Sequence, residues 1–168
     1  MTITVRALEE QDIEETIQVM KEAWNYTYET LEKGHYPQEA HDFDMSLNTP
    51  ERYTASMEYE HGFFFIAELD GKIIGSIRGE IIGASGFALI RNIAVHQDSQ
   101  RKGGGKALME HTLEYLKGQG CHKISLHTQA VLVPAVNMYL KIGFIPEAYL
   151  AKQWWGMDFI LMSIWFEK

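Results

Sequence analysis

The residues of this sequence best suited to chemistry lie between positions 93 and 106. This segment reads IAVHQDSQRKGGGK, and it carries three basic residues and three adjacent glycines at the start of a predicted helix. Glycines allow a backbone to approach a ligand closely, and the first amides of a helix are unpaired donors at its positive end. The pattern therefore predicts a site for a phosphate or a pyrophosphate.

Two common nucleotide-binding patterns do not fit this segment. A Walker loop requires a glycine at position 100 and a Ser or Thr at position 107, where this chain has Gln100 and Ala107. The dinucleotide fingerprint requires a third glycine three residues after Gly105, and Leu108 stands there. A nucleotide-binding switch is therefore disfavoured.

The chain resembles a known family in this segment and elsewhere. Residues 100–105, Gln-Arg-Lys-Gly-Gly-Gly, match the Gln/Arg-x-x-Gly-x-Gly/Ala signature of the Gcn5-related N-acetyltransferases, the GNAT superfamily. Similar motifs stand at Val5-Arg6-Ala7, at Ile93-Ala94-Val95 and at residues 139–144, which read Tyr-Leu-Lys-Ile-Gly-Phe. The resemblance covers nearly the whole chain and is closest to the branches that acetylate protein N-termini and ribosomal proteins.

This resemblance implies acetyl-CoA as the cosubstrate. The pyrophosphate is expected on Gln100, Arg101, Lys102, Gly103, Gly104, Gly105 and Lys106, and the pantetheine arm is expected beside Ile93, Ala94 and Val95. The family often has an asparagine where this chain has Leu132, so that contact is not expected here. Asn137 is a candidate amide for the cofactor, with an exposed helical residue as the alternative.

Acetyl transfer to an amine sets requirements that particular residues must meet. An alkylammonium with a pKa of about 10.4 must lose a proton before it attacks, and the leaving thiolate benefits from an acid. The thioester oxygen needs a fixed donor as it gains negative charge. By the resemblance, Tyr139 is the expected acid and the backbone amide of Val95 is the expected oxyanion donor.

His127 is the first candidate for the base. In the predicted strand 123–127 it alternates with apolar side chains, so it need not face the core. It precedes Tyr139 by twelve positions, which is the spacing between base and tyrosine in the branches that this chain resembles. A structural or pocket-lining histidine is the alternative. The reserve candidates are Glu80 and His96.

The segments expected to face the acceptor are aromatic and acidic. The candidates for binding it are Trp24, Tyr28, Glu29 and Trp154, with Glu32, Asp42 and Asp44 as further carboxylates for an amine. Ordinary packing is the alternative for each. The expected acceptor is a peptide α-amine, a lysine or a small amine. No metal is expected, because the histidines and aspartates of residues 35–44 have irregular spacing.

The elements that position these residues follow a recognisable order. We expect a strand at 3–5, helices at 12–24 and 50–60, strands at 63–69, 72–82 and 87–95, a helix at 103–118, a strand at 123–127, a helix at 134–142, and strands at 144–152 and 159–166. Residues 25–48 show no clean period, so we expect a broken helix and a loop there. The order βααβββαβαββ predicts a single α+β domain over residues 1–168, with a mixed, mostly antiparallel sheet.

Composition excludes several classes of protein. The chain has 168 residues, a net charge of −8 and a pI near 5.3, which disfavours nucleic-acid binding. Its single cysteine rules out an internal disulfide. Residues 1–60 carry 14 acidic and 4 basic side chains, so the acidity is local and favours an amine partner. With no signal peptide and no membrane span in the sequence, we expect a cytoplasmic location; a homodimer stays open.

One alternative function keeps the same fold. A catalytically silent module that binds coenzyme A for regulation would retain the phosphate loop without the chemistry. The presence of both Tyr139 and His127 argues against this alternative.

Overall fold

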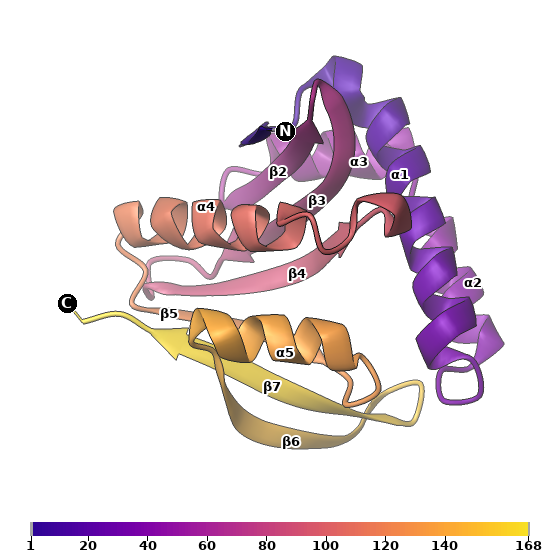
Figure 1. Cartoon of the computed structure of the whole chain (residues 1–168). Coiled ribbons are helices and arrows are strands. Elements are labelled where there is room, and N and C mark those ends of the chain that lie inside the picture. Colours follow the sequence, from indigo (N-terminus) through magenta and orange to yellow (C-terminus); the bar gives the residue numbers. More distant parts are fainter. Residues whose placement is uncertain (1, 168) are drawn as a thin grey trace.

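The computed structural model describes residues 2–167, and its centre is a seven-stranded sheet (Figure 1). The strand order is β1-β2-β3-β4-β5-β7-β6, and only the β4–β5 pair is parallel. The strands are β1 (Ile3–Ala7), β2 (Gly62–Leu69), β3 (Lys72–Ile81), β4 (Phe87–Val95), β5 (Lys123–Thr128), β6 (Ile145–Trp154) and β7 (Met157–Trp165). This is the mixed, mostly antiparallel sheet that the sequence predicted.

Helices cover both faces of the sheet. They are α1 (Ile13–Thr27), α2 (Gln38–Ser46), α3 (Pro50–Glu58), α4 (Gly104–Gly118) and α5 (Val133–Ile142), with short turns η1 (Glu10–Asp12), η2 (Tyr28–Glu32) and η3 (Gln97–Ser99). Figure 1 shows α4 and α5 on one face, while α1 and α3 pack against the other. No helix within residues 2–167 has the length and apolar character needed to cross a membrane.

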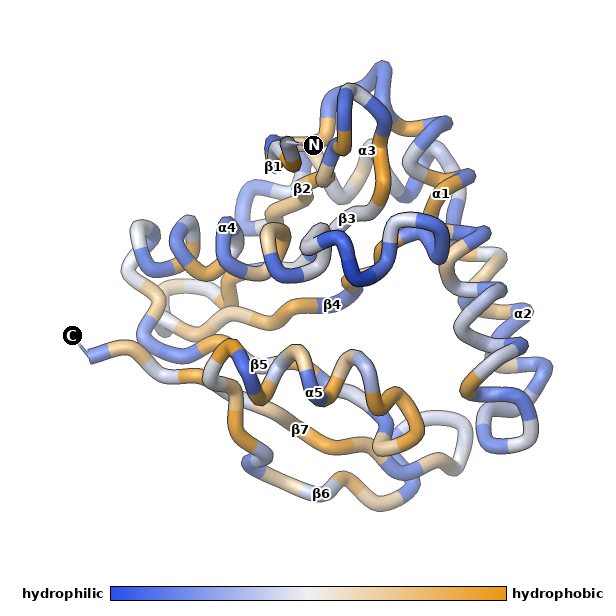
Figure 2. Tube along the Cα trace, viewed as in Figure 1, coloured by the Kyte–Doolittle hydropathy of each residue, from blue (hydrophilic) through white to orange (hydrophobic). Residues whose placement is uncertain are grey.

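Strand β2 shows why the sheet needs helices on both faces. Its central residues are buried on both sides, because Phe63 and Phe65 join the core under α4 whereas Phe64 and Ile66 join the core under α1 and α3. Successive side chains of a strand point to opposite faces, so a run of apolar residues requires cover on each. In Figure 2 the trace of β2 is mostly hydrophobic, whereas along α4 hydrophilic and hydrophobic residues alternate.

Two local predictions are confirmed. Asp70 and Gly71 form the turn between β2 and β3 with φ angles of 51° and 81°, as a two-residue hairpin requires. Thr49 caps α3, since its hydroxyl accepts a hydrogen bond from the Arg52 amide at 3.4 Å and Pro50 occupies the first turn.

Residues 25–48 form a broken helix with a loop, as the sequence predicted. Helix α1 continues into η2, a single π-helical turn closed by the bond from the Lys33 amide to the Tyr28 carbonyl at 2.8 Å, and α2 follows. Such turns interrupt the helical period and are frequent at functional sites. The rest of the predicted element order is confirmed.

The parallel strands β4 and β5 separate along their length, as Figure 1 shows. Only Phe87–Ile90 of β4 pair with Lys123–Leu126 of β5, although β5 remains paired with β7 as far as Thr128. The register between β3 and β4 shifts at Arg78/Gly79, which leaves Arg91 as the extra residue of a β-bulge. Beyond this bulge, one edge of β4 has no strand beside it.

Candidate active site

The free edge of β4 has backbone groups available for a ligand. The His96 amide donates to the Ile74 carbonyl at 2.8 Å, so residues 96 and 74 form a hydrogen-bonded pair of the β3–β4 ladder. Opposite residues of an antiparallel pair alternate between bonded and non-bonded pairs. The amides of Ile93 and Val95, which fall in the non-bonded pairs, therefore point away from β3 and towards the space that β5 has left.

A cavity of about 930 Å³ lies along this free edge. Ten residues predicted to hold the cofactor line it: Ile93, Ala94, Val95, Gln100, Arg101, Gly103, Gly104, Gly105, Lys106 and Asn137. Lys102 is exposed and does not belong to the lining. Leu132 does belong to it, so an apolar side chain faces the cavity where the family often has an amide.

The glycines before α4 fit the close approach of a phosphate group. Gly103 caps α4 with a φ of 96°, in the left-handed region. A Cβ on Gly104 would lie 2.9 Å from the Ile74 side chain, and one on Gly105 would lie 3.0 Å from the Met138 sulfur. The start of α4 therefore packs closely against β3 and α5, and its first amides lie at the cavity. The loop that precedes α4 is hydrophilic (Figure 2).

Replacing Gly103 by alanine should weaken coenzyme A binding about tenfold. A side chain at this positive φ is disfavoured by about 1–2 kcal/mol. The turn can avoid this strain by changing conformation when no ligand is bound, but not when it holds the ligand, so the strain weakens binding. Titration calorimetry with coenzyme A measures the change. Gly118→Ala is the matched control, because Gly118 is at the other end of α4 with nothing within 4 Å of its added Cβ. Equal affinities for both variants would contradict this role of the turn.

Tyr139 lies on α5 and is 6% exposed, at the wall of the same cavity. Its ring packs in the core near Phe144, with 6.0 Å between the ring centroids. Among the described residues its hydroxyl has no hydrogen-bond partner, and burial raises its pKa above the ordinary value. The hydroxyl is therefore protonated at neutral pH and available to a ligand as a donor.

His127 lies where two cavities meet. It lines the cavity along β4 and also a second one of about 600 Å³, and its ring stands edge-on to Trp154 with 4.8 Å between centroids. Ile124 and Leu126 of β5 face the core, so His127 lies on the opposite face, as predicted. Burial, and secondarily the charge of Arg91, lowers its pKa, so its imidazole is neutral at pH 7.

Both reserve candidates for the base already contact another titratable or charged side chain, although Glu80 lines the second cavity together with His127. Glu80 forms an ion pair with Arg91 at 2.5 Å, which neutralises its carboxylate. His96 contacts Glu22 at 2.8 Å and lines neither of the two cavities. This geometry favours His127 over both.

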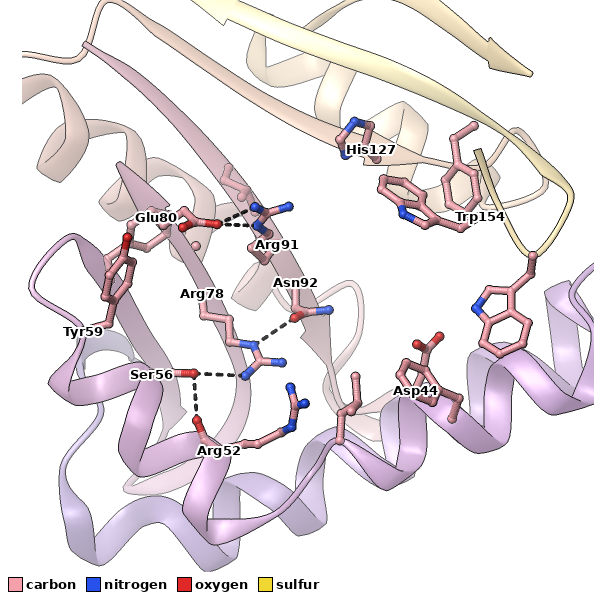
Figure 3. A pocket seen from close by; sticks show the side chains of 18 of the residues that line it. Asp44, Arg52, Ser56, Tyr59, Arg78, Glu80, Arg91, Asn92, His127 and Trp154 are labelled. Carbon is pink, nitrogen blue, oxygen red and sulfur yellow. Dashed lines mark hydrogen bonds and ion pairs between the residues drawn. The ribbon is translucent and has the colours of Figure 1, made fainter. Parts of the chain in front are cut away.

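The second cavity opens on the other side of β4, between α2, α3 and the β6–β7 turn (Figure 3). Of the tryptophans predicted to bind the acceptor, Trp154 lines this cavity and Trp24 lines the first one. Trp155 also lines this cavity, and Phe43, which no sequence pattern indicated, stands near it with 5.7 Å between ring centroids.

The structure does not place Tyr28 or Glu29 in either cavity. Tyr28 is buried, stacks on His41 at 4.0 Å between centroids and donates its hydroxyl to Gln38 at 3.0 Å. Glu29 is exposed and pairs with Lys33 at 2.7 Å. The prediction that these two side chains bind the acceptor is therefore not retained, because the π-helical turn directs them away from the cavities.

The turn directs Glu32 into the first cavity instead. Gln129, just after β5, donates to the Glu32 carboxylate at 3.2 Å, and Tyr36 donates its hydroxyl to Asp44. Burial and the nearby charge of Asp44 raise the pKa of Glu32 to about 7. Burial likewise raises the pKa of Asp44. Two carboxylates that repel each other in this way form a site that a cation would stabilise.

The comparisons with known proteins agree with this architecture. The chain belongs to the acetyltransferase (GNAT) family, whose model matches residues 17–144. Streptothricin acetyltransferase A of Bacillus subtilis is 32% identical over 123 residues, which is 73% of this chain and 65% of that protein. The ribosomal protein bS18-alanine N-acetyltransferase of Escherichia coli is 32% identical over 110 residues, covering 66% of this chain and 70% of that protein.

Solved structures share the whole fold. The PaiA N-acetyltransferase from Thermoplasma acidophilum, solved in complex with coenzyme A, superposes with a TM-score of 0.83 at 22% identity, over 99% of this chain and 100% of that chain. The bS18-alanine N-acetyltransferase structure from Escherichia coli gives a TM-score of 0.75 at 21% identity, over 99% and 96%. At these identities the superpositions establish the fold alone.

Proposed function

We propose that the protein is an acetyl-CoA-dependent N-acetyltransferase that acts on a primary amine. The observation that carries this proposal is the junction of the two cavities. The cavity with the predicted cofactor residues and the second cavity share eight residues in their walls: Tyr36, Asp44, Leu47, Arg78, Ile90, Arg91, Asn92 and His127. A cosubstrate along β4 and an amine from the opposite side would therefore meet at this junction.

The free edge of β4 supports a defined position for the cosubstrate. Ile93 and Val95 offer amides and carbonyls to a pantetheine arm, in the way that a neighbouring strand would use them. The Gln100 side chain already donates to the Val95 carbonyl at 3.3 Å, so the outward-pointing amide is the main group that Val95 has left for a ligand. The first turn of α4 and the side chains of Arg101 and Lys106 would hold the pyrophosphate.

Bound acetyl-CoA supplies an acetyl thioester, and transfer forms an N–C bond, breaks the C–S bond and releases coenzyme A. Neutral His127 would accept the proton that the ammonium loses. The Val95 amide would donate to the thioester oxygen as negative charge develops there. Tyr139 would donate its proton to the leaving sulfur.

The carboxylates of Glu32 and Asp44 would attract the acceptor ammonium. Among the acidic residues of segment 1–60, only these two line the cavities. They are therefore our candidates for attracting the amine partner that the local acidity of the sequence favours. Their raised pKa values reflect unfavourable burial of negative charge, which an ammonium between them would offset.

A panel assay of coenzyme A release tests the proposal. Candidate acceptors are polyamines, amino acids, aminoglycosides and peptides with free N-termini, including the alanine N-terminus of protein bS18 and streptothricin, the substrates named for the two relatives. Thermal shift with acetyl-CoA, coenzyme A and ATP reports binding independently. Stabilisation by acetyl-CoA without turnover of any amine would support the silent module instead. A cytoplasmic location and a homodimer stay predictions.

A further inference from the structure

The second cavity contains two arginines that form no ion pair within residues 2–167. Five residues with full charges line it: Asp44, Arg52, Arg78, Glu80 and Arg91. Glu80 and Arg91 form an ion pair with each other. Neither Arg52 nor Arg78 pairs with a carboxylate anywhere in the part of the chain that the structure describes, residues 2–167.

Arg78 is held in place by neutral groups. Its Nε donates to the Asn92 amide oxygen at 2.8 Å and its Nη1 donates to the Ser56 hydroxyl at 3.4 Å. Its guanidinium also stands over the Tyr53 and Phe64 rings, at 5.6 and 5.8 Å from their centroids. These contacts fix the orientation of a half-buried cation and leave its charge uncompensated.

Arg52 adds a second positive charge at the same place. Its side chain extends from α3 towards the Arg78 guanidinium, and Figure 3 shows both groups facing the same part of the cavity. Burial lowers the pKa of Arg78, and the charge of Arg52 lowers it further. Two adjacent guanidiniums repel each other unless an anion lies between them, and their planar donor forks suit a carboxylate.

We infer that the acceptor is a small amine that also carries a carboxylate, which Arg52 and Arg78 bind while Glu32 and Asp44 attract its ammonium. The cavity is positive at its α3 side and negative towards α2, so it suits an amino acid whose two charges are separated by several bonds. A volume of about 600 Å³ is in the range of small-molecule sites. This inference rests on the proposed acetyl transfer.

A matched series of acceptors tests this inference. Coenzyme A release is measured with ω-amino acids of increasing chain length, with the corresponding ω-amino amides and with alkylamines of equal length. We expect the acids to exceed their amides about 10- to 100-fold in kcat/KM, the range for a hydrogen-bonded ion pair. The chain length with the largest ratio reports the separation of the two charged ends.

Variants assign this preference to the arginines. Arg52→Met removes one guanidinium from an exposed position, and Arg78→Lys keeps a charge but loses the planar fork. Both should reduce the ratio of acid to amide about tenfold. Lys72→Met is the control for Arg52→Met, because it removes one positive charge as that variant does. Lys72 is exposed and lines neither cavity, so this control should keep the ratio.

A binding measurement separates this inference from the proposed function. Calorimetry with N-acetylated ω-amino acids and their amides reports carboxylate binding without any turnover. If Arg52→Met binds the acids more weakly and the free ω-amino acids are turned over, both the proposed acetyl transfer and the carboxylate-binding role of the arginines are supported. Carboxylate-dependent binding without turnover would overturn acetyl transfer to these amines. Equal turnover of acids and amides, or faster turnover of peptide N-termini, would overturn the inference that the acceptor carries a carboxylate. The proposed acetyltransferase activity would still stand.

Discussion

Replacing Tyr139 by phenylalanine should lower kcat by about 10²- to 10⁴-fold, the usual contribution of a positioned acid. The variant loses one hydroxyl that has no hydrogen-bond partner among the described residues. The fold therefore loses no hydrogen bond, and the packing of the ring near Phe144 remains. Coenzyme A release at saturating concentrations of both substrates measures kcat, and calorimetry should show an almost unchanged affinity for coenzyme A.

Tyr115 provides the matched control. It lies on α4, packs edge-on to Phe65 with 5.2 Å between centroids and lines neither cavity. Tyr115→Phe should leave kcat unchanged. If Tyr139→Phe turned over as fast as this control, Tyr139 would not be the acid and a water molecule would have to protonate the sulfur.

The second large effect concerns His127. His127→Ala should lower kcat/KM by about 10²-fold or more, because the amine must then lose its proton to water. Since burial and the charge of Arg91 lower the His127 pKa, activity should rise with pH through a value below the ordinary 6.5, and the variant should lose this rise. His35→Ala, at an exposed position outside both cavities, should behave as the unmodified protein.

Glu32 should produce a separate rise in the same pH profile. Its carboxyl group has a raised pKa of about 7, so it is largely neutral below that value and negatively charged above it. If Glu32 attracts the acceptor ammonium, kcat/KM should increase as pH passes 7, and Glu32→Gln should remove this increase while retaining the one due to His127. A profile in which Glu32→Gln abolished both rises would assign the proton transfer to Glu32.

Much of the fold was predictable because it depends on local patterns. Alternating and continuous apolar runs predicted the strands, Asp70-Gly71 predicted a hairpin, and Thr49-Pro50 predicted a helix start. Residues 25–48 were predictable only as a broken helix and loop, because a π-helical turn breaks the helical period. The sequence therefore offered Tyr28, Glu29 and Glu32 alike for the acceptor, and only the structure shows that Glu32 alone of these three lines a cavity.

The sequence by itself determined the family, the glycine-rich loop that we propose for the pyrophosphate, and the two candidate groups on β5 and α5. These features depend on glycine conformations and on spacing within single elements. Only the tertiary structure decided where β4 and β5 separate, and that Arg52 on α3 lies beside Arg78 on β3. Such pairs depend on how elements that are distant in the sequence pack against one another, and the local spacing of residues does not determine this packing.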